Sequence, residues 1–281
     1  MRVGDGVQLW AESIGDREHP AILLLGGAAW SMDWWEDDLC GRLVALGRRV
    51  VRYDNRDTGR SSSWPPGEPG YTGEDLVTDA VAVLDAFGIG RAHVVGVSMG
   101  GGIAQCVALD HGERVATLTL MSASPIAHEG RDLPGMTPAL KELFAHPPPE
   151  PDWGDRKAVI AYIVDAERAF AGPGDHDEAH LRRLAGRVYD RSDDIAASMI
   201  NHWLLGGDGR ERPSLGTLAG LPTLVMHGTD DPLFPLEHGR ALAEMIPGAR
   251  LVELEGVGHG LAPRRLWDLL VDELAEHTRP A

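Results

Sequence analysis

Short apolar runs alternate with amphipathic stretches along the first half of this sequence, and no other feature restricts the fold as strongly. The runs are 21–25 (AILLL), 49–53 (RVVRY), 92–97 (AHVVGV) and 117–121 (TLTLM). Each is short and rich in β-branched or aliphatic residues, which is typical of buried strands. Strands that alternate with helices indicate successive βαβ units around a parallel sheet. We therefore expect an α/β fold, with a mostly parallel central sheet flanked by helices.

One of the intervening stretches carries clear helix signals. Residues 74–87 place apolar side chains at helical spacing. Thr72 and Asp75 resemble a capping box at the start, and Gly88 supplies a stop. The sequence predicts a helix here, between the second and third strands.

The pattern changes after about residue 125. Prolines at positions 134, 138, 147–149 and 151 interrupt short helical pieces, and no strand-like run occurs before Leu221. Regular alternation then returns, with strands expected at 222–227 and 250–254 and helices at about 237–246 and 264–277. We expect residues 1–124 and 214–281 to form the core and residues 125–213 to form a helical cap inserted into it.

The pentapeptide Gly96-Val97-Ser98-Met99-Gly100 directly follows the third apolar run. It matches the G-x-S-x-G pattern, in which a sharp strand-to-helix turn raises a serine hydroxyl above a sheet. Glycines two positions on either side remove Cβ atoms that would clash in such a turn. The small residues that begin the next stretch fit a helix packed closely under the sheet. Ser98 is therefore the expected nucleophile.

A serine nucleophile needs a base, and twelve histidines compete for that role. Most lie in expected strands, at a helix end or in the insertion, where structural or surface roles are expected. His259 differs because it stands in Gly256-Val257-Gly258-His259-Gly260, just after the run 250–254. A loop there can bring the imidazole over the carboxyl edge of the sheet, where open α/β sheets place their active sites. His259 is the expected base.

The acid should stand between the serine and the histidine in the chain order typical of this motif. Asp230 and Asp231 both follow the expected strand 222–227, so either carboxylate could face His259. We prefer Asp231 as the group that orients the imidazole and stabilises its charged form. Asp230 stays open as the alternative, with helix capping as its structural role.

An oxyanion hole requires two backbone N–H donors. One should come from the residue after the nucleophile, Met99, and the other from the loop after the strand 21–25, where Gly27 is our choice and Ala28 its competitor. Four aromatic residues could line an apolar substrate pocket or could simply pack in the core: Trp30, Trp34, Trp203 and Phe234.

The bulk composition excludes several classes of protein. The formal net charge of −17 repels phosphate backbones, which argues against nucleic acid as a partner. Cys40 and Cys106 are the only cysteines, so we expect free thiols and no metal site. No signal-peptide core or long apolar segment is evident, so we expect no membrane association and a cytoplasmic location. The Arg48-Arg49 doublet is expected to be solvated. Nothing in the sequence indicates an oligomeric state.

These motifs resemble those of the α/β-hydrolases and, more narrowly, of the aclacinomycin methylesterase group of anthracycline-modifying esterases. The resemblance is carried by residues 52–62 (RYDNRDTGRSS), 79–99, 222–232 and 256–259. It covers most of residues 5–121 and 220–278 and is weak in the insertion. Asp57 stands where many α/β-hydrolases have glycine, which favours the methylesterase-like branch. The resemblance implies the same roles for Ser98, Asp231, His259, Gly27 and Met99.

Together these features predict a serine esterase that forms an acyl-enzyme on a small-molecule ester and needs no cofactor. By family analogy the substrate is a methyl or other small-alcohol ester of a polyketide-like compound. Other reactions of the same three residues stay open, namely those of a lactonase, an aminopeptidase, a carbon–carbon bond hydrolase or a perhydrolase. A small-molecule receptor with slow turnover is a further alternative. A serine at position 98 argues against epoxide hydrolases and haloalkane dehalogenases, which use a carboxylate nucleophile.

Overall fold

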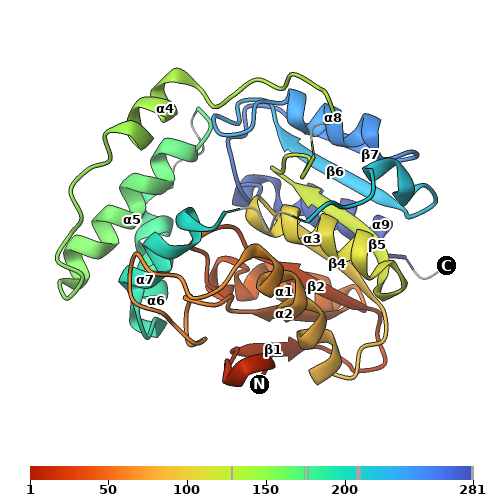
Figure 1. Ribbon diagram of the computed structural model, residues 1–281, viewed down its shortest axis with the longest axis horizontal. Coiled ribbons are helices and arrows are strands. Elements are labelled where there is room, and N and C mark those ends of the chain that lie inside the picture. Colours follow the sequence, from red (N-terminus) through yellow and green to blue (C-terminus); the bar gives the residue numbers. More distant parts are fainter. Residues whose placement is uncertain (128, 174, 176, 207–209, 280–281) are drawn as a thin grey trace.

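The computed structural model describes residues 1–127, 129–173, 175, 177–206 and 210–279. Within these residues, seven strands form one sheet in the order β1-β3-β2-β4-β5-β6-β7 (Figure 1). Only β1 is antiparallel to its neighbour, and the other neighbours pair in parallel. The strands are β1 (Ala11–Ile14), β2 (Ala21–Leu25), β3 (Arg49–Tyr53), β4 (Ala92–Val97), β5 (Val115–Met121), β6 (Thr223–Gly228) and β7 (Arg250–Leu254).

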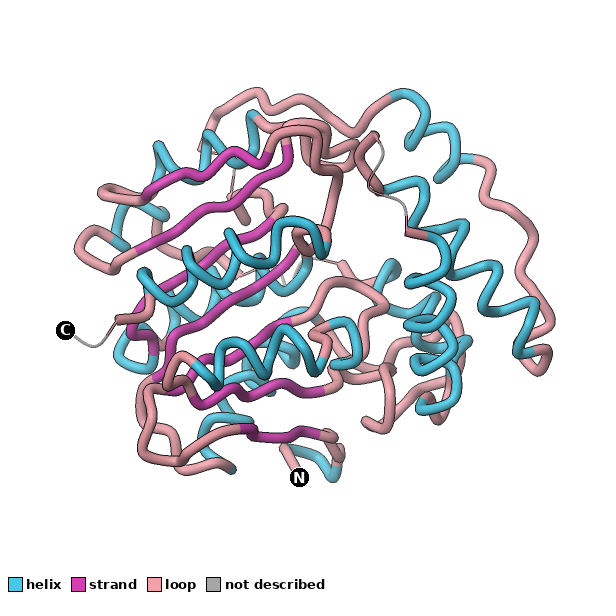
Figure 2. Tube along the Cα trace, turned by 180° about the vertical axis from the view of Figure 1, so that it is seen from behind, coloured by secondary structure: helices cyan, strands magenta, loops and turns pink. Residues whose placement is uncertain are grey.

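Helices cover both faces of this sheet, as the tube view shows (Figure 2). One face packs against α2 (Gly73–Ala86), α3 (Met99–Asp110) and α8 (Glu237–Met245). The other packs against α1 (Asp37–Ala45) and α9 (Trp267–His277). Shorter 3-10 segments are η1 (Gly4–Gly6), η2 (Met32–Trp34), η3 (Gly112–Arg114), η4 (Asn201–Leu204), η5 (Leu215–Leu218) and η6 (Arg264–Leu266). This three-layer arrangement confirms the α/β fold class predicted from the sequence.

Successive side chains along each strand point to opposite faces of the sheet, and helices bury both faces. Leu23 and Val94 pack into the core under α2, α3 and α8, whereas Ile22 and Val95 pack under α1 and α9. All four are fully buried. Burying one such side chain contributes about 1.5–3 kcal/mol, so the apolar runs in the sequence are a main source of stabilisation for this sheet.

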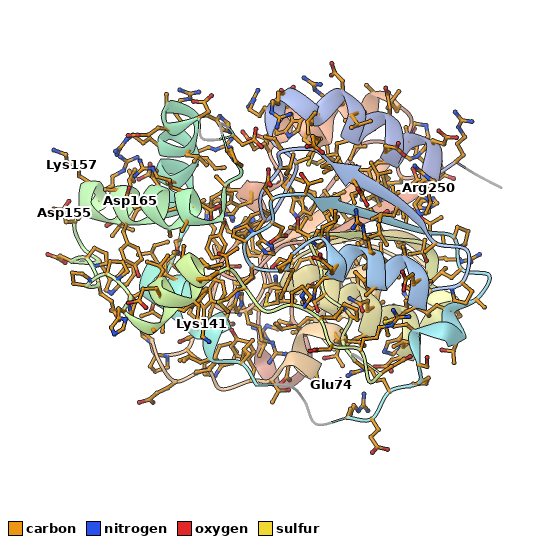
Figure 3. All side chains as sticks on the ribbon, turned by 90° about the horizontal axis from the view of Figure 1, so that it is seen from above. Glu74, Lys141, Asp155, Lys157, Asp165 and Arg250 are labelled. Carbon is orange, nitrogen blue, oxygen red and sulfur yellow. The ribbon has the colours of Figure 1, made fainter. Side chains whose placement is uncertain are left out.

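The chain between β5 and β6 includes a group of helices that lies at one end of the sheet (Figure 1). It contains α4 (Pro138–Ala145), α5 (Arg156–Phe170), α6 (Glu178–Arg191) and α7 (Ile195–Ile200), followed by η4. Ile160, Ile163 and Leu184 form a separate apolar cluster there, which also includes Trp34 from the core. Asp155, the residue before α5, and Lys157 and Asp165 within α5 are exposed charged residues of this region, labelled in Figure 3. The division of the chain at residues 124 and 214 stays a prediction.

Two parts of the core differ from what the sequence indicates. The short strand β1 was not predicted, because its sequence AESI contains two polar residues and shows no apolar run. In the structure all four of its residues are half-buried. Arg48 and Arg49 are buried, whereas we expected them to be solvated. Arg48 Nε donates to Thr278 Oγ1 at 2.8 Å, and Arg49 Nε donates to Ser13 Oγ at 2.8 Å. These partners lie far away in the sequence, so no local pattern reveals them.

The two cysteines, Cys40 and Cys106, are both buried, and they are not joined in a disulfide. In the part of the chain that the structure describes, none of the helices combines the length and the apolar character that crossing a membrane requires.

Candidate active site

Ser98 occupies the sharp turn between β4 and α3. Its backbone angles are φ +53° and ψ −118°, a left-handed region that a non-glycine residue rarely adopts. A Cβ atom at Gly96 would collide with the carbonyl group of Gly100, and one at Gly100 would collide with the carbonyl of Leu25. The glycine spacing in the sequence thus has the steric cause that we expected. The turn leaves Ser98 partly exposed at the carboxyl edge of the sheet.

The structure brings Ser98, His259 and Asp231 into one hydrogen-bonded chain. Ser98 Oγ lies 2.8 Å from His259 Nε2, and His259 Nδ1 lies 2.8 Å from Asp231 Oδ2. A carboxylate can only accept hydrogen bonds, so Nδ1 carries the imidazole proton and Nε2 is free to accept the hydroxyl proton of Ser98. This is the geometry that a nucleophile, its base and an orienting acid require.

The two aspartates after β6 have different environments. Asp231 is buried, and its Oδ1 also accepts hydrogen bonds from the backbone N–H groups of Leu233 and Phe234, at 2.9 and 2.8 Å. Asp230 is exposed, and its backbone N–H donates to Val257 O at 3.0 Å. Of these two aspartates, only Asp231 is within hydrogen-bond distance of His259 among the contacts of the described residues. The geometry therefore favours Asp231 as the candidate acid.

His259 is held by the inserted segment as well as by the core. Its backbone N–H donates to the carbonyl of Phe170, the last residue of α5, at 2.8 Å. A Cβ atom at Gly258 would collide with that same carbonyl, so the glycine permits this close approach. The ring of Phe234 packs edge-on against the imidazole, with 5.4 Å between centroids. The position of the candidate base therefore depends on α5.

Two backbone N–H groups lie near Ser98 as candidates for an oxyanion hole. Met99 begins α3, so its N–H has no partner within the helix and lies at the positive end of the helix dipole. Gly27 follows β2, and a Cβ atom placed there would be 3.6 Å from Ser98 Cβ. Ala28 lines the same cavity as Gly27 and Ser98. Both predicted donors thus stand beside the nucleophile, and Ala28 stays open as the competitor of Gly27.

A small cavity of about 40 Å³ opens directly at Ser98 and His259. It is also lined by Gly27, Ala28, Trp30, Glu167, Phe170, Trp203 and Gly260. A space of this size holds little more than one or two water molecules. A bulky acyl group therefore needs further room beside it.

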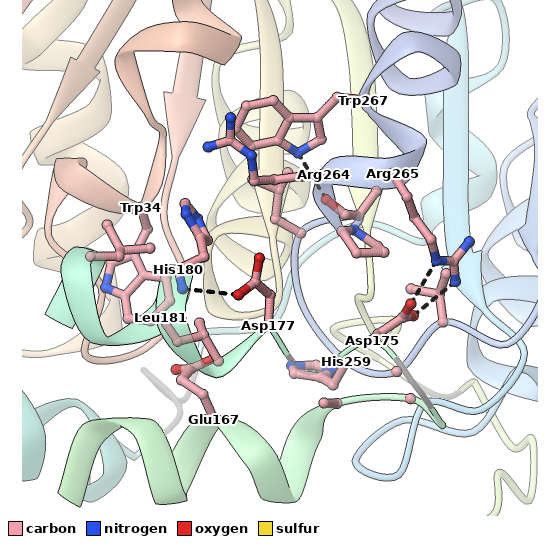
Figure 4. Close-up of a pocket in the computed structure, with 18 of the residues that line it drawn as sticks. Trp34, Glu167, Asp175, Asp177, His180, Leu181, His259, Arg264, Arg265 and Trp267 are labelled. Atoms are coloured by element: carbon pink, nitrogen blue, oxygen red, sulfur yellow. Dashed lines mark hydrogen bonds and ion pairs between the residues drawn. The ribbon is translucent and has the colours of Figure 1, made fainter. Parts of the chain in front are cut away.

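A larger pocket of about 350 Å³ shares three of these lining residues, namely Trp30, Glu167 and His259. Its volume falls in the range of small-molecule sites. In Figure 4, Glu167 of α5 lies on one side of the pocket and Trp267 of α9 on the opposite side. Arg265 forms an ion pair with Asp175 at 2.7 Å at the border of the pocket. Glu36, on the same border, lies 3.4 Å from Arg264 Nη1 and 2.8 Å from His180 Nε2.

Glu167 is a site residue that the sequence did not reveal. It is half-buried between the two cavities, and burial raises the pKa of its carboxyl group to about 7, with a smaller opposing effect from the Trp30 indole N–H. In the sequence it is one of several charged residues on an amphipathic helix. Only the packing of α5 against the core shows that it faces the candidate nucleophile.

The aromatic residues expected to bind substrate have different positions. Trp30 and Trp203 both line the small cavity, and Trp203 stacks on Phe170 with 6.3 Å between centroids. Trp34 lines only the larger of the two cavities and stacks on Trp30 at 4.9 Å. Phe234 contacts the His259 ring and is not among the residues that line these two cavities.

Comparison with known proteins agrees with the fold and with the resemblance noted in the sequence. The chain is 36% identical to rhodomycin D methylesterase DauP of Streptomyces sp. (strain C5), with 100% of this chain and 98% of the relative covered. It is 33% identical to rhodomycin D methylesterase DnrP of Streptomyces peucetius, with the same coverage. These alignments span the inserted segment, where we had expected little similarity.

Solved structures place the chain in the same fold. The crystal structure of a hydrolase from Pseudomonas aeruginosa PA01 superimposes with a TM-score of 0.73 at 25% identity, covering 100% of this chain and 97% of the other. A family model described as the alpha/beta hydrolase fold matches residues 20–262. The chain therefore belongs to the α/β-hydrolase family.

Proposed function

We propose that this α/β-hydrolase cleaves carboxylic esters through an acyl-enzyme intermediate on Ser98. The observation that carries the proposal is the continuous hydrogen-bonded chain from Ser98 Oγ through His259 to Asp231, with 2.8 Å at each link. The relatives named as methylesterases support the same reaction class.

In the first half of the reaction, His259 Nε2 takes the proton of Ser98 as Oγ attacks the ester carbonyl carbon. The backbone N–H groups of Met99 and Gly27 stabilise the oxyanion of the tetrahedral intermediate. The carbon–oxygen bond to the alcohol then breaks, and the imidazolium returns the proton to the departing oxygen. Asp231 stabilises that imidazolium while it exists.

In the second half, His259 takes a proton from a water molecule, which attacks the acyl carbon. The second tetrahedral intermediate collapses when the bond to Ser98 Oγ breaks and Oγ regains a proton from the imidazolium. The carboxylic acid product leaves, and the enzyme returns to its starting state. Apart from the substrate and one water molecule, each step uses only side chains and backbone groups of this chain.

We propose a methyl or other small-alcohol ester of a polycyclic, polyketide-like compound as the substrate class. The volume of about 40 Å³ at Ser98 suits a small alcohol group, and the adjoining volume of about 350 Å³ suits a bulkier acyl part. Trp30 borders both spaces and offers an aromatic face to a ring system. The two methylesterase relatives support this choice.

A panel of esters tests the proposal. We expect steady turnover of p-nitrophenyl acetate and release of methanol from polycyclic methyl esters, with both activities lost in Ser98→Ala. Release of methanol at the same rate by Ser98→Ala would exclude Ser98 as the nucleophile. Turnover of lactones or aminoacyl amides but not of esters would favour another hydrolase reaction. A cytoplasmic location and the absence of a nucleic-acid partner stay predictions from the sequence.

A further inference from the structure

His202 joins the inserted segment to the loop that carries the candidate oxyanion donor. It lies in η4, and its ring is buried, with 5% of the residue exposed. The backbone N–H of Ala29 donates to His202 Nδ1 at 3.0 Å, and His202 Nε2 lies 2.9 Å from the carbonyl oxygen of Arg56. One imidazole thus bonds two loops that come from distant parts of the chain.

These two partners fix the protonation state of the ring. A backbone N–H can only donate, so Nδ1 must be unprotonated, and a carbonyl oxygen can only accept, so Nε2 must carry the proton. Burial also lowers the pKa of His202 to about 4, which keeps the imidazole neutral at physiological pH. His202 is therefore a permanent hydrogen-bond acceptor for Ala29, and it is unsuited to act as a general base.

The bond from Ala29 stabilises a strained turn. Trp30 N–H donates to Gly27 O at 3.2 Å, so residues 27–30 form a tight turn with Ala29 as its third residue. Ala29 has a φ of +64°, which costs a non-glycine residue on the order of 1 kcal/mol or more. Without an acceptor for its N–H, Ala29 can relax to a negative φ. That change rotates the peptide between Ala28 and Ala29 and moves the adjoining N–H groups.

We propose that His202 is a positioning residue that holds the loop of Gly27 and Ala28 in the conformation that directs a backbone N–H at the oxyanion. The proposal rests on the ester hydrolysis proposed above. It requires no contact between His202 and the substrate, because His202 acts through Ala29. The segment between β5 and β6 then has two roles: His202 Nδ1 accepts a hydrogen bond from the oxyanion loop (residues 27–30), and Trp203 lines the cavity at Ser98.

The neighbours of His202 in η4 support this role. Trp203 lines the cavity at Ser98 together with Gly27 and Ala28. Asn201 is fully buried, and its Nδ2 donates to Asp57 Oδ2 at 2.9 Å while its Oδ1 accepts from Gly67 N–H at 2.7 Å. Three consecutive residues thus anchor η4 to the core, support the oxyanion loop and contact the cavity. Because His202 of η4 accepts from Ala29 N–H, the position of η4 and the conformation of the oxyanion loop are linked.

Kinetics of His202→Ala and His202→Gln test the proposal. Loss of an oxyanion donor lowers kcat by about 10²–10³-fold, so a displaced donor in His202→Ala should lower kcat by roughly 10- to 100-fold. KM should change little, because the ground-state contacts are kept. A glutamine retains one acceptor and one donor, so His202→Gln should recover most of kcat. Unchanged kcat in His202→Ala would overturn the proposal.

Ser198→Ala is the matched control. Ser198 is buried in α7, and its hydroxyl donates to the backbone carbonyl of Asp57, so this variant also removes a buried bond between the inserted segment and the core. It leaves residues 26–30 untouched and should keep kcat near that of the wild type. An equal loss of kcat in Ser198→Ala and His202→Ala would show that general docking of the insertion is responsible, and would overturn a specific role of His202.

Two further measurements report on the loop directly. The infrared carbonyl stretch of a slowly hydrolysed acyl-enzyme should move to higher wavenumber in His202→Ala, because the acyl oxygen loses a hydrogen bond. Backbone hydrogen exchange of residues 26–30 should accelerate in His202→Ala and not in Ser198→Ala. The exchange measurement needs no turnover, so it tests His202 even if the wild type hydrolyses no ester. Unchanged exchange would overturn the proposal, whereas accelerated exchange without ester hydrolysis would overturn only the proposed function.

Discussion

Glu167 makes the stability of this protein depend on pH in a defined direction. Burial raises the pKa of its carboxyl group from the ordinary value of 4.5 to about 7, so the folded protein binds this proton more tightly than the unfolded chain does. Below about pH 4.5 the carboxyl group is protonated in both states and contributes nothing. Between about pH 4.5 and 7 the unfolded chain releases the proton first, and the fold loses stability as the pH rises.

The size of this effect follows from the shift. One pKa unit corresponds to 1.36 kcal/mol, so a change from 4.5 to about 7 corresponds to about 3 kcal/mol at most. Glu167 is half-buried and solvent screens part of its charge, so the expected penalty above pH 7 is about 1–3 kcal/mol. Glu167→Gln removes the titration and keeps an amide of similar shape. The variant should therefore be more stable than the wild type at pH 8 and about equally stable at pH 4.

Urea unfolding followed by tryptophan fluorescence at several pH values between 4 and 8 measures this difference. Asp165→Asn is the matched control, because Asp165 lies on the exposed side of the same helix and its variant should show only a small offset. His259, His180 and Asp177 also border the pocket, and all three are present in both the wild type and the variant. A difference between Glu167→Gln and wild type that stays constant from pH 4 to pH 8 would refute the reasoning.

Two further substitutions test the site and its support. Asp231→Asn should lower kcat for ester hydrolysis by about 10⁴-fold, because the amide disfavours the imidazole tautomer that accepts the serine proton. The kcat of Asp230→Asn in the same assay should stay near that of the wild type. A larger loss of kcat in Asp230→Asn than in Asp231→Asn would identify Asp230 as the acid. Arg191→Met should destabilise the protein by about 3–5 kcal/mol in urea unfolding, because both oxygens of the fully buried Asp54 bond to that guanidinium at 2.6 Å. A loss below about 1 kcal/mol would contradict this reasoning and would mean that the backbone N–H groups of Met32 and Arg60 suffice as partners of Asp54.

The sequence was most informative where local sterics control the structure. The elbow at Ser98 and the apolar strands β2, β3 and β4 could be predicted because glycine spacing and β-branched runs act within a few residues. The capping box at Thr72 and Asp75 could be predicted for the same reason, because its hydrogen bond, from Thr72 N–H to Asp75 Oδ2 at 2.8 Å, joins residues three positions apart.

The remaining features depend on contacts between distant segments. Glu167 and His202 are ordinary polar residues of the insertion until α5 and η4 pack against the core, and the bond from Ala29 to His202 spans 173 residues. Asp230 and Asp231 are adjacent in sequence, and only the folded loop shows which of them is buried beside His259. Hydrophobic periodicity carries no information about such pairings.

Trapping of the nucleophile tests the central claim most directly. The wild type should react with a fluorophosphonate to give a single adduct, located on Ser98 by peptide mass spectrometry, and His259→Ala should react at least about 10²-fold more slowly because the hydroxyl loses its base. An adduct on another residue, or equally fast labelling of Ser98 in His259→Ala, would contradict the account.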